Sequence, residues 1–388
     1  MTMNFTFQNQ TRIVFGEGEI TQLATLVPSD AIVMLLFGGG SIQKNGVHAA
    51  VTKALGERKV VAFGGVEPNP DYATILAAAK LARDQNVTFI LGVGGGSVID
   101  AAKFLAAVIV MDVADPWDAL LAETAVPRPL ANGAVLTLPA TGSESNPVSV
   151  ISNSKRGLKL PFAIEAARPQ FAILDPTTMA SLPRRQLQNG VVDAMTHVLE
   201  QYLTLPVNAP VQYGFSETLL EVLISWGPIL FETDEARQAE ARENIMWVAN
   251  LALNGLIGSG VAQDWSTHMI GHALTALYGI DHAQSLTLVM PHLLRRRLVD
   301  KQTMLARFGR RVWHLEGDEK EVALGAILRT EAFFQDMECP VHFSDLPEIS
   351  LDVEAVIRHL EEAGQLPLGE DGKIDAALVR IILNDASQ

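Results

Sequence analysis

The sequence predicts an α/β N-terminal domain over residues 1–183, followed by an all-α C-terminal domain over residues 184–388. In the first half, short apolar runs alternate with helical patterns, as in a parallel sheet covered by helices on both faces. Beyond Pro183, patterns of helical period dominate and runs rich in β-branched residues become rare. At 388 residues, 48% of them hydrophobic, the chain is long enough to form two cores.

Five apolar runs in the first half are the expected strands of the sheet. They cover residues 31–37, 59–63, 88–93, 134–138 and 171–174. A helical run over 98–110 follows the third of them. In the second half, amphipathic patterns predict helices over residues 190–202, 213–226, 243–256 and 265–278.

The third strand runs directly into a glycine-rich loop and then a helix. Glycines at Gly94, Gly95 and Gly96 let the backbone approach an anion, and the helix that follows Ser97 offers free N–H groups. Asp100 lies in the first turn of that helix. A dinucleotide pyrophosphate fits this arrangement, which makes the N-terminal domain Rossmann-like. The alternative is a tight strand-to-helix turn that binds nothing.

The end of the first strand bears on the choice between NAD(H) and NADP(H). In folds that select NAD, an acidic residue commonly holds the ribose hydroxyls. Here the strand ends in Phe37-Gly38-Gly39-Gly40-Ser41, without a carboxylate. A 2′-phosphate would meet no repulsion there and could bind backbone N–H groups, the Ser41 hydroxyl or Lys44. We therefore predict NADP(H), although the ribose could be held from elsewhere.

A third loop, over residues 137–146, follows the fourth strand and is dense in hydroxyl groups. Its Thr137 and Thr141 could line the ribose and nicotinamide of a cofactor. An ordinary turn rich in serine and threonine is the alternative interpretation.

Asp193, His197, His268, His272 and His282 are candidate ligands of a divalent metal ion such as Zn²⁺ or Fe²⁺. Residues four apart share one face of a helix, so Asp193 can converge with His197, and His268 with His272. Such a site can polarise a carbonyl or alkoxide oxygen. The five residues exceed the four positions of a common site, and each histidine could instead be a satisfied core residue.

Composition excludes several other classes of protein. The net charge of −15 argues against a nucleic acid partner, and we expect the Arg295–Arg297 run to form a solvated helix face. The start of the chain lacks the features of a signal peptide, and no apolar run is long enough to span a membrane. The single cysteine, Cys339, allows no internal disulfide. These features predict a cytoplasmic protein.

The motifs, taken in order, resemble the iron-containing (group III) alcohol dehydrogenase family over essentially the whole chain. The segments that carry the resemblance are GGGSVIDAAK (94–103), LTLPATGSES (136–145), FAILDP (171–176), NGVVDAMTHVLEQY (189–202) and QDWSTHMIGHALTALYGIDHAQSL (263–286). The Gly38–Ser41 strand end and the Pro68-Asn69-Pro70 motif resemble the NADP-dependent branch of butanol dehydrogenases and aldehyde reductases. The fold this implies is that of the dehydroquinate synthase-like proteins.

The resemblance implies roles for individual residues. It places the metal ligands at Asp193, His197, His268 and His282, and makes His272 an additional active-site histidine that can move a proton. The cofactor-binding positions that it implies are Gly39, Ser41, Gly94, Gly95, Gly96, Ser97, Asp100, Thr137, Leu138, Thr141, Lys159 and Leu182.

The activity implied is metal-dependent, NADP(H)-linked hydride transfer to and from short-to-medium chain aldehydes or primary alcohols. The family also suggests a homodimer that binds neither nucleic acid nor a membrane. A glycerol dehydrogenase-like oxidation of polyols and a non-catalytic sensor of nucleotide or metal are the alternatives. The Asp-x₃-His pair followed by two further histidines fits the alcohol dehydrogenase branch better than the glycerol dehydrogenases or dehydroquinate synthases.

Overall fold

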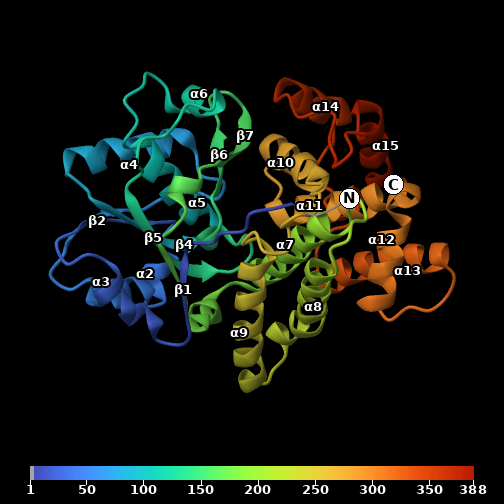
Figure 1. Ribbon diagram of the computed structural model, residues 1–388, viewed down its shortest axis with the longest axis horizontal. Helices are drawn as coiled ribbons and strands as arrows, with labels where there is room; N and C mark the ends of the chain where they lie inside the picture. Colours follow the sequence, from blue (N-terminus) through green and yellow to red (C-terminus); the bar gives the residue numbers. More distant parts are fainter. Residues whose placement is uncertain (1–3) are drawn as a thin grey trace. The chain divides into compact units, whose positions relative to one another are not determined.

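The computed structural model describes residues 4–388, and the chain in it forms two compact units (Figure 1). One unit is Gln8–Pro183, and the other is Arg184–Gln388 together with residues 4–7.

A six-stranded sheet, parallel throughout, forms the centre of the first unit. Its order is β1 (Arg12–Phe15), β8 (Phe171–Leu174), β5 (Ala131–Leu138), β4 (Phe89–Gly95), β2 (Ile32–Phe37) and β3 (Lys59–Phe63). The five predicted strands are confirmed to within three residues at each end. The edge strand β1 was not predicted, because four residues with two exposed ends carry too short an apolar pattern.

Alternate side chains of the central strands point to opposite faces of the sheet. Met34 and Leu36 of β2 pack with α4 (Tyr72–Asp84) and α5 (Gly96–Val108). Val33 and Leu35 pack on the other face with η1 (Glu19–Gln22), α1 (Leu23–Leu26) and α3 (Val47–Leu55). All four side chains are 1% exposed or less, and burying each one contributes about 1.5–3 kcal/mol. Figure 1 shows α3 and the pair α4 and α5 on opposite sides of the strands.

An antiparallel hairpin of β6 (Val148–Asn153) and β7 (Leu158–Ala163) lies outside the main sheet and was not predicted. It is hydrogen-bonded to α5, because the Val150 N–H donates to the Asp100 carboxylate at 2.9 Å. The remaining elements of this unit are α2 (Ser41–Lys44), α6 (Pro116–Leu121), η2 (Ser143–Ser145), η3 (Glu165–Ala167) and η4 (Pro176–Ser181).

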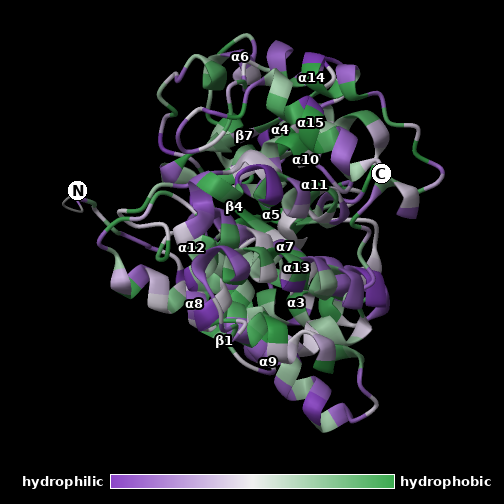
Figure 2. Ribbon diagram, turned by 90° about the vertical axis from the view of Figure 1, so that its right-hand side faces the viewer, coloured by the Kyte–Doolittle hydropathy of each residue, from purple (hydrophilic) through white to green (hydrophobic). Residues whose placement is uncertain are grey.

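The second unit is built from helices, as predicted. They are α7 (Arg184–Tyr202), α8 (Pro210–Trp226), η5 (Pro228–Phe231), α9 (Glu235–Ala252), α10 (Ser266–Tyr278), α11 (His282–Arg296), α12 (Leu298–Arg311), α13 (Glu319–Asp336), η6 (Phe343–Asp345), α14 (Val353–Glu362) and α15 (Ala376–Ala386). Figure 2 shows the alternation of hydrophilic and hydrophobic residues in α14, whose Val356, Ile357 and Leu360 are buried. None of the helices described over residues 4–388 is long and apolar enough to cross a membrane.

Three predicted helices begin earlier than expected: the one predicted over 190–202 begins at Arg184, the one over 213–226 at Pro210, and the one over 243–256 at Glu235. The helix predicted over 243–256 begins earlier, at Glu235, because the Asp234 carboxylate caps it by accepting from the Ala236 N–H at 3.0 Å. It ends at Ala252, and an irregular segment leads on to α10.

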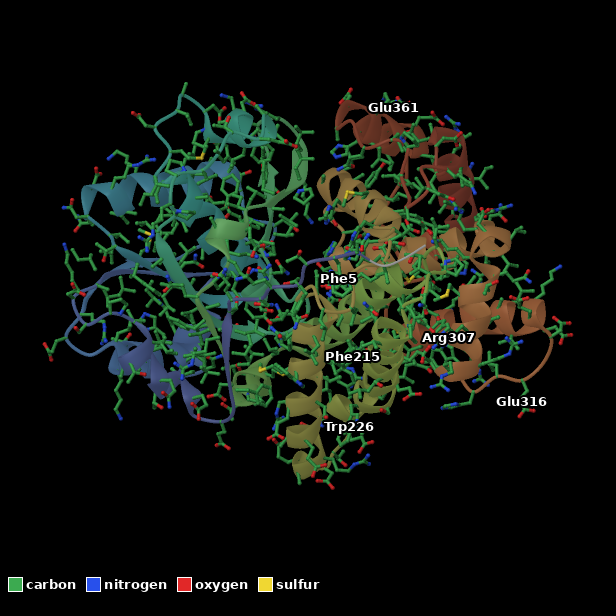
Figure 3. All side chains as sticks on the ribbon, viewed as in Figure 1. Phe5, Phe215, Trp226, Arg307, Glu316 and Glu361 are labelled. Carbon is green, nitrogen blue, oxygen red and sulfur yellow. The ribbon has the colours of Figure 1, made fainter. Side chains whose placement is uncertain are left out.

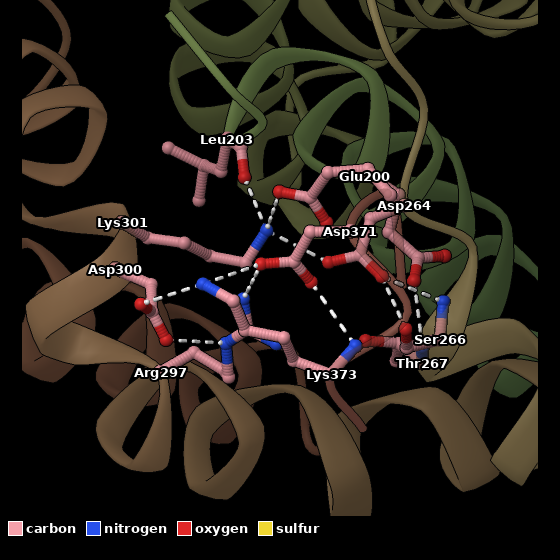
Figure 4. A network of polar contacts seen from close by, with 11 residues as sticks. Glu200, Leu203, Asp264, Ser266, Thr267, Arg297, Asp300, Lys301, Asp371 and Lys373 are labelled. Atoms are coloured by element: carbon pink, nitrogen blue, oxygen red, sulfur yellow. Dashed lines mark hydrogen bonds and ion pairs between the residues drawn. The ribbon is translucent and has the colours of Figure 1, made fainter. Parts of the chain in front are cut away.

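The prediction that the Arg295–Arg297 run forms a solvated face is wrong for its last residue. The Arg297 side chain is 2% exposed and pairs with Asp300 at 3.1 Å and Asp371 at 2.8 Å (Figure 4). Neighbouring carboxylates compensate the buried guanidinium, a tertiary arrangement that the local sequence does not show.

Candidate active site

The predicted cofactor-binding loops lie at one edge of the parallel sheet. Strands β2, β4 and β5 are neighbours, and Gly39, Gly94–Ser97 and Thr137–Thr141 lie at or just beyond their carboxyl ends. Ligands of open α/β sheets bind at this edge. Leu182 follows η4 and lies near the same edge of the sheet. The neighbouring Ser181 hydroxyl accepts a hydrogen bond at 2.9 Å from the side chain of Asn45, which comes just after α2.

The glycine-rich loop is tightly packed, and two of its glycines have no room for a side chain. A Cβ at Gly94 would lie 2.6 Å from Val98, and one at Gly96 would lie 2.5 Å from the Thr141 hydroxyl oxygen. Helix α5 begins at Gly96, so its first backbone N–H groups lie at the sheet edge. This cradle suits a pyrophosphate.

Gly39 differs from these two glycines, because packing does not require it. A Cβ built there would meet nothing within 4 Å among the described residues, and both Gly39 and Ser41 are exposed. A carboxylate at position 39 would fit sterically. Packing among the described residues therefore does not explain the glycine at this position.

Ser97 is joined to the Pro-Asn-Pro motif of residues 68–70. The Asn69 N–H donates to the Ser97 hydroxyl at 3.3 Å, and Asn69 has the left-handed φ of 57°. Predicted cofactor residue Lys159 is buried on β7, where it lies opposite Ser152 of β6.

Asp100 anchors the Thr141–Asn146 loop. Its carboxylate accepts from the Ser143 hydroxyl and forms an ion pair with Lys103 at 3.3 Å. Lys103 is 1% exposed and also donates to the carbonyl and side-chain oxygens of Asn146 at 3.3 and 3.2 Å. Burial lowers the pKa of Lys103, and Asp100 opposes that shift. Sequence reasoning missed Lys103, although it lies one helical turn from Asp100.

The candidate metal ligands converge in the second unit from three helices. Ligand atoms of Asp193 on α7, His268 on α10 and His282 at the start of α11 all lie within 4.8 Å of one another. The Nε2 atoms of His268 and His282 are each 3.8 Å from Asp193 Oδ1. His197 lies beside this group, with Nδ1 3.6 Å from Asp193 Oδ1 and its ring stacked on His268 at 4.6 Å between centroids.

Two ligand-type atoms of this group are left without a hydrogen-bond partner in the described part of the chain, as expected where a cation would bind. Asp193 Oδ1 and His268 Nε2 are buried, and neither has a hydrogen-bond partner among residues 4–388. Buried polar atoms are almost always satisfied in folded proteins. One carboxylate and several imidazoles form a ligand set that suits Zn²⁺ or Fe²⁺, so these residues fit a divalent metal.

Electrostatics within the group agree with this interpretation. Burial alone would raise the pKa of the Asp193 carboxyl, but His197, His282 and His268 together hold it below its usual range. Burial would lower the pKa of His268, yet Glu200 and Asp193 raise it to about 9. Both shifts come from attraction between buried carboxylates and imidazoles, so a bound cation would take over the role that a proton on the imidazole has in its absence.

His272 and Trp265 lie next to the candidate ligands. The His272 ring is 5.1 Å from His282 and 6.2 Å from His268, and the residue is buried. Trp265 packs 5.3 Å from His268 with a left-handed φ of 61°. A tryptophan held in this conformation stores backbone strain of order 1–3 kcal/mol, a feature that concentrates at functional sites.

A second group, formed by His292, Glu331 and His342, also has ligand-type atoms within 4.8 Å of one another. Two of its members already have partners, however. Arg295 pairs with the Glu331 carboxylate, and the His292 Nε2–H donates to the Val341 carbonyl at 3.0 Å.

Comparison with known proteins matches both units. Residues 10–176 match the family described as iron-containing alcohol dehydrogenase, and residues 188–362 match the C-terminal part of the Fe-containing alcohol dehydrogenase family. The chain is 45% identical over 390 residues to the NADPH-dependent aldehyde reductase YqhD of Escherichia coli K12, covering 99% of each. It is 35% identical to the NADP-dependent alcohol dehydrogenase 3 of Entamoeba histolytica, covering 99% of this chain and 100% of that one.

Solved structures also match the fold of this chain. The crystal structure of E. coli YqhD superposes with a TM-score of 0.95 and covers 99% of both chains. That of the NADH-dependent butanol dehydrogenase A of Thermotoga maritima, 32% identical, superposes with a TM-score of 0.94 over 100% of this chain and 99% of that one. The predicted family, fold class and enzyme class are thus confirmed. The chain belongs to the iron-containing alcohol dehydrogenase family.

Proposed function

We propose that the protein is a metal-dependent, NADP(H)-linked alcohol dehydrogenase that reduces short-to-medium chain aldehydes and oxidises the corresponding primary alcohols. The observation that carries the proposal is the convergence of the buried Asp193 and His268 with the partly buried His282, and with His197 beside them, in a chain of this family. When bound, the metal polarises the substrate oxygen and NADPH supplies the hydride.

The chain's own residues have distinct parts in this proposal. Asp193, His197, His268 and His282 hold the metal. His272 moves the proton to or from the substrate oxygen, a role for which an imidazole is suited near neutral pH. The glycine cradle at Gly94–Ser97 holds the pyrophosphate of the cofactor, and the Thr137–Thr141 loop lines its ribose.

The relatives differ in their choice of cofactor. The matching protein of Clostridium acetobutylicum is named as an NADH-dependent butanol dehydrogenase and that of Bacillus subtilis as a probable one, whereas the E. coli and Entamoeba enzymes are named as NADPH- and NADP-dependent. The open, neutral position at Gly39 and the Ser41 hydroxyl support NADP(H) for this chain, because a 2′-phosphate meets no carboxylate there.

Steady-state kinetics test the proposal against its alternatives. We expect continuous NADPH oxidation with butyraldehyde, and much slower NADP⁺ reduction with glycerol than with butanol. A polyol dehydrogenase would reverse that alcohol preference. A sensor would bind NADPH stoichiometrically and stop, which would refute the proposed activity.

We further propose a homodimer located in the cytoplasm that has no nucleic acid partner. The acidic composition, with 44 Asp and Glu against 29 Lys and Arg, supports the last point. Light scattering after size-exclusion chromatography tests the dimer, and a mass of one 41.9 kDa chain would exclude it.

A further inference from the structure

Glu200 is a buried carboxylate next to the candidate metal ligands that has no place in the proposed reaction. It lies on α7 three residues after His197 and seven after Asp193, and is 4% exposed. One of its oxygens accepts from the Thr267 N–H at 2.6 Å, and the other makes a very short contact with Nδ1 of His268. Both partners belong to the first turn of α10.

This contact fixes which nitrogen of His268 faces the ligand group. An ionised carboxylate can only accept, so Nδ1 carries the hydrogen and, in the neutral ring, Nε2 keeps its lone pair. Nε2 is the atom that lies 3.8 Å from Asp193 Oδ1. Carboxylates that hold metal-ligating histidines in this way set the orientation of the ring and raise its basicity as a ligand.

We infer that Glu200 is a positioning residue, which holds His268 in the orientation and tautomer that bind the metal. This inference rests on the proposed metal site.

Buried ionic contacts hold the backbone on both sides of the Glu200–His268 pair (Figure 4). Lys301 donates to the Leu203 carbonyl, just past α7, at 2.7 Å, and pairs with Asp264, just before α10, at 2.8 Å. Glu370 also accepts from Lys301 at 2.7 Å. The Asp264 N–H donates to the Glu200 carbonyl at 2.9 Å. The end of α7 and the start of α10 are therefore joined where Glu200 and His268 meet.

A purely structural role for Glu200 is the competing explanation, since its bond to the Thr267 N–H alone would satisfy the start of α10. Glu217 provides a matched control for that explanation. It is equally buried at 4%, lies on α8, and accepts from the Tyr202 hydroxyl at 2.8 Å and from Arg307 at 2.6 Å. Arg307 is labelled in Figure 3. Glu217 touches none of the candidate ligands in these contacts.

The experiment compares Glu200→Gln with Glu217→Gln in the full-length protein. Zn²⁺ affinity is measured by competition with a chromophoric chelator. The coordination of Co²⁺ is followed by the d–d absorption of the Co²⁺-loaded protein, and the free energy of unfolding is measured with urea. We expect both variants to lose stability. Only Glu200→Gln should also bind Zn²⁺ about 10- to 100-fold more weakly and show a shifted Co²⁺ spectrum.

Wild-type Zn²⁺ affinity and an unchanged Co²⁺ spectrum in Glu200→Gln would overturn the inference, as would equal loss of affinity in both variants. If Glu200→Gln does not fold, ¹⁵N-histidine NMR of the Zn²⁺-loaded wild type decides instead. We expect hydrogen on Nδ1 of His268, identified with a His268→Gln variant, and hydrogen on Nε2 would overturn the inference. A wild type that binds no Zn²⁺ or Co²⁺ would instead refute the proposed metal site.

Discussion

The packing of Gly96 against Thr141 leads to a prediction whose size follows from the structure. A Cβ at position 96 would lie 2.5, 2.9 and 3.2 Å from the hydroxyl oxygen, the methyl group and the Cβ of Thr141. The Thr141 hydroxyl cannot simply rotate away without cost, since it accepts from the Ser143 N–H at 3.3 Å. Gly96→Ala should therefore overpack the cradle and lower the free energy of unfolding by about 1–3 kcal/mol.

A double-mutant cycle locates the cause. Thr141→Ala removes the two closest contacts, so Gly96→Ala should cost at least about 1 kcal/mol less in that background than in the wild type. Gly39→Ala is the control, because its Cβ meets nothing within 4 Å, and it should change stability little.

Urea unfolding followed by circular dichroism measures these differences, and tryptophan fluorescence titration measures NADPH affinity in the same variants. Gly96→Ala should also weaken NADPH binding, since the clash lies at the start of α5. If Gly96→Ala is as stable as the wild type, or if Thr141→Ala does not reduce its cost, the close approach described here is wrong.

Three further predictions concern cofactor choice, proton transfer and the buried cysteine. Gly39→Asp should lower the preference for NADPH over NADH, expressed as kcat/KM, by about fivefold or more, because a carboxylate about 4 Å from a phosphate costs at least ~1 kcal/mol even in water. Gly39→Ser should leave that preference unchanged. His272→Ala should reduce kcat about 100-fold or more while Zn²⁺ stoichiometry stays unchanged, and loss of metal would show that His272 is a ligand instead. Burial raises the pKa of the Cys339 thiol to about 12, so it should resist Ellman's reagent at pH 8 until the protein unfolds. Because the unfolded thiol ionises at about pH 8.5, the contribution of Cys339 to the free energy of unfolding is full below that pH and is lost as the pH rises toward about 12. Rapid reaction of the native thiol with Ellman's reagent would contradict its burial.

The parallel sheet could be predicted because its strands are buried on both faces. Their sequences are continuous apolar runs, such as IVMLLF in β2, and these remain recognisable without any knowledge of the partners. The β6–β7 hairpin was missed for the opposite reason. Its strands alternate buried and partly exposed residues, and bonds to Asp100 and Asp71 in distant segments hold it in place.

The residues of the candidate site could also be predicted only in part. The spacing of Asp193 and His197 on one helix predicts a shared face, and Glu200 continues that face at the next turn, so the sequence contained a pattern that could have identified it. Lys301 had no such pattern. Its partners Asp264, Glu370 and the Leu203 carbonyl come from three separate segments, and only the tertiary structure brings them together.

The central claim is that Asp193, His197, His268 and His282 hold the metal on which NADPH oxidation depends. The most direct test is the initial rate of NADPH oxidation with butyraldehyde, measured for untreated, chelator-stripped and Zn²⁺- or Fe²⁺-restored protein, in the wild type and in Asp193→Ala. We predict that stripping abolishes the activity, that one of the two metals restores it in the wild type, and that Asp193→Ala retains neither stoichiometric metal nor activity. Undiminished oxidation by stripped protein, or stoichiometric metal in Asp193→Ala, would contradict this account.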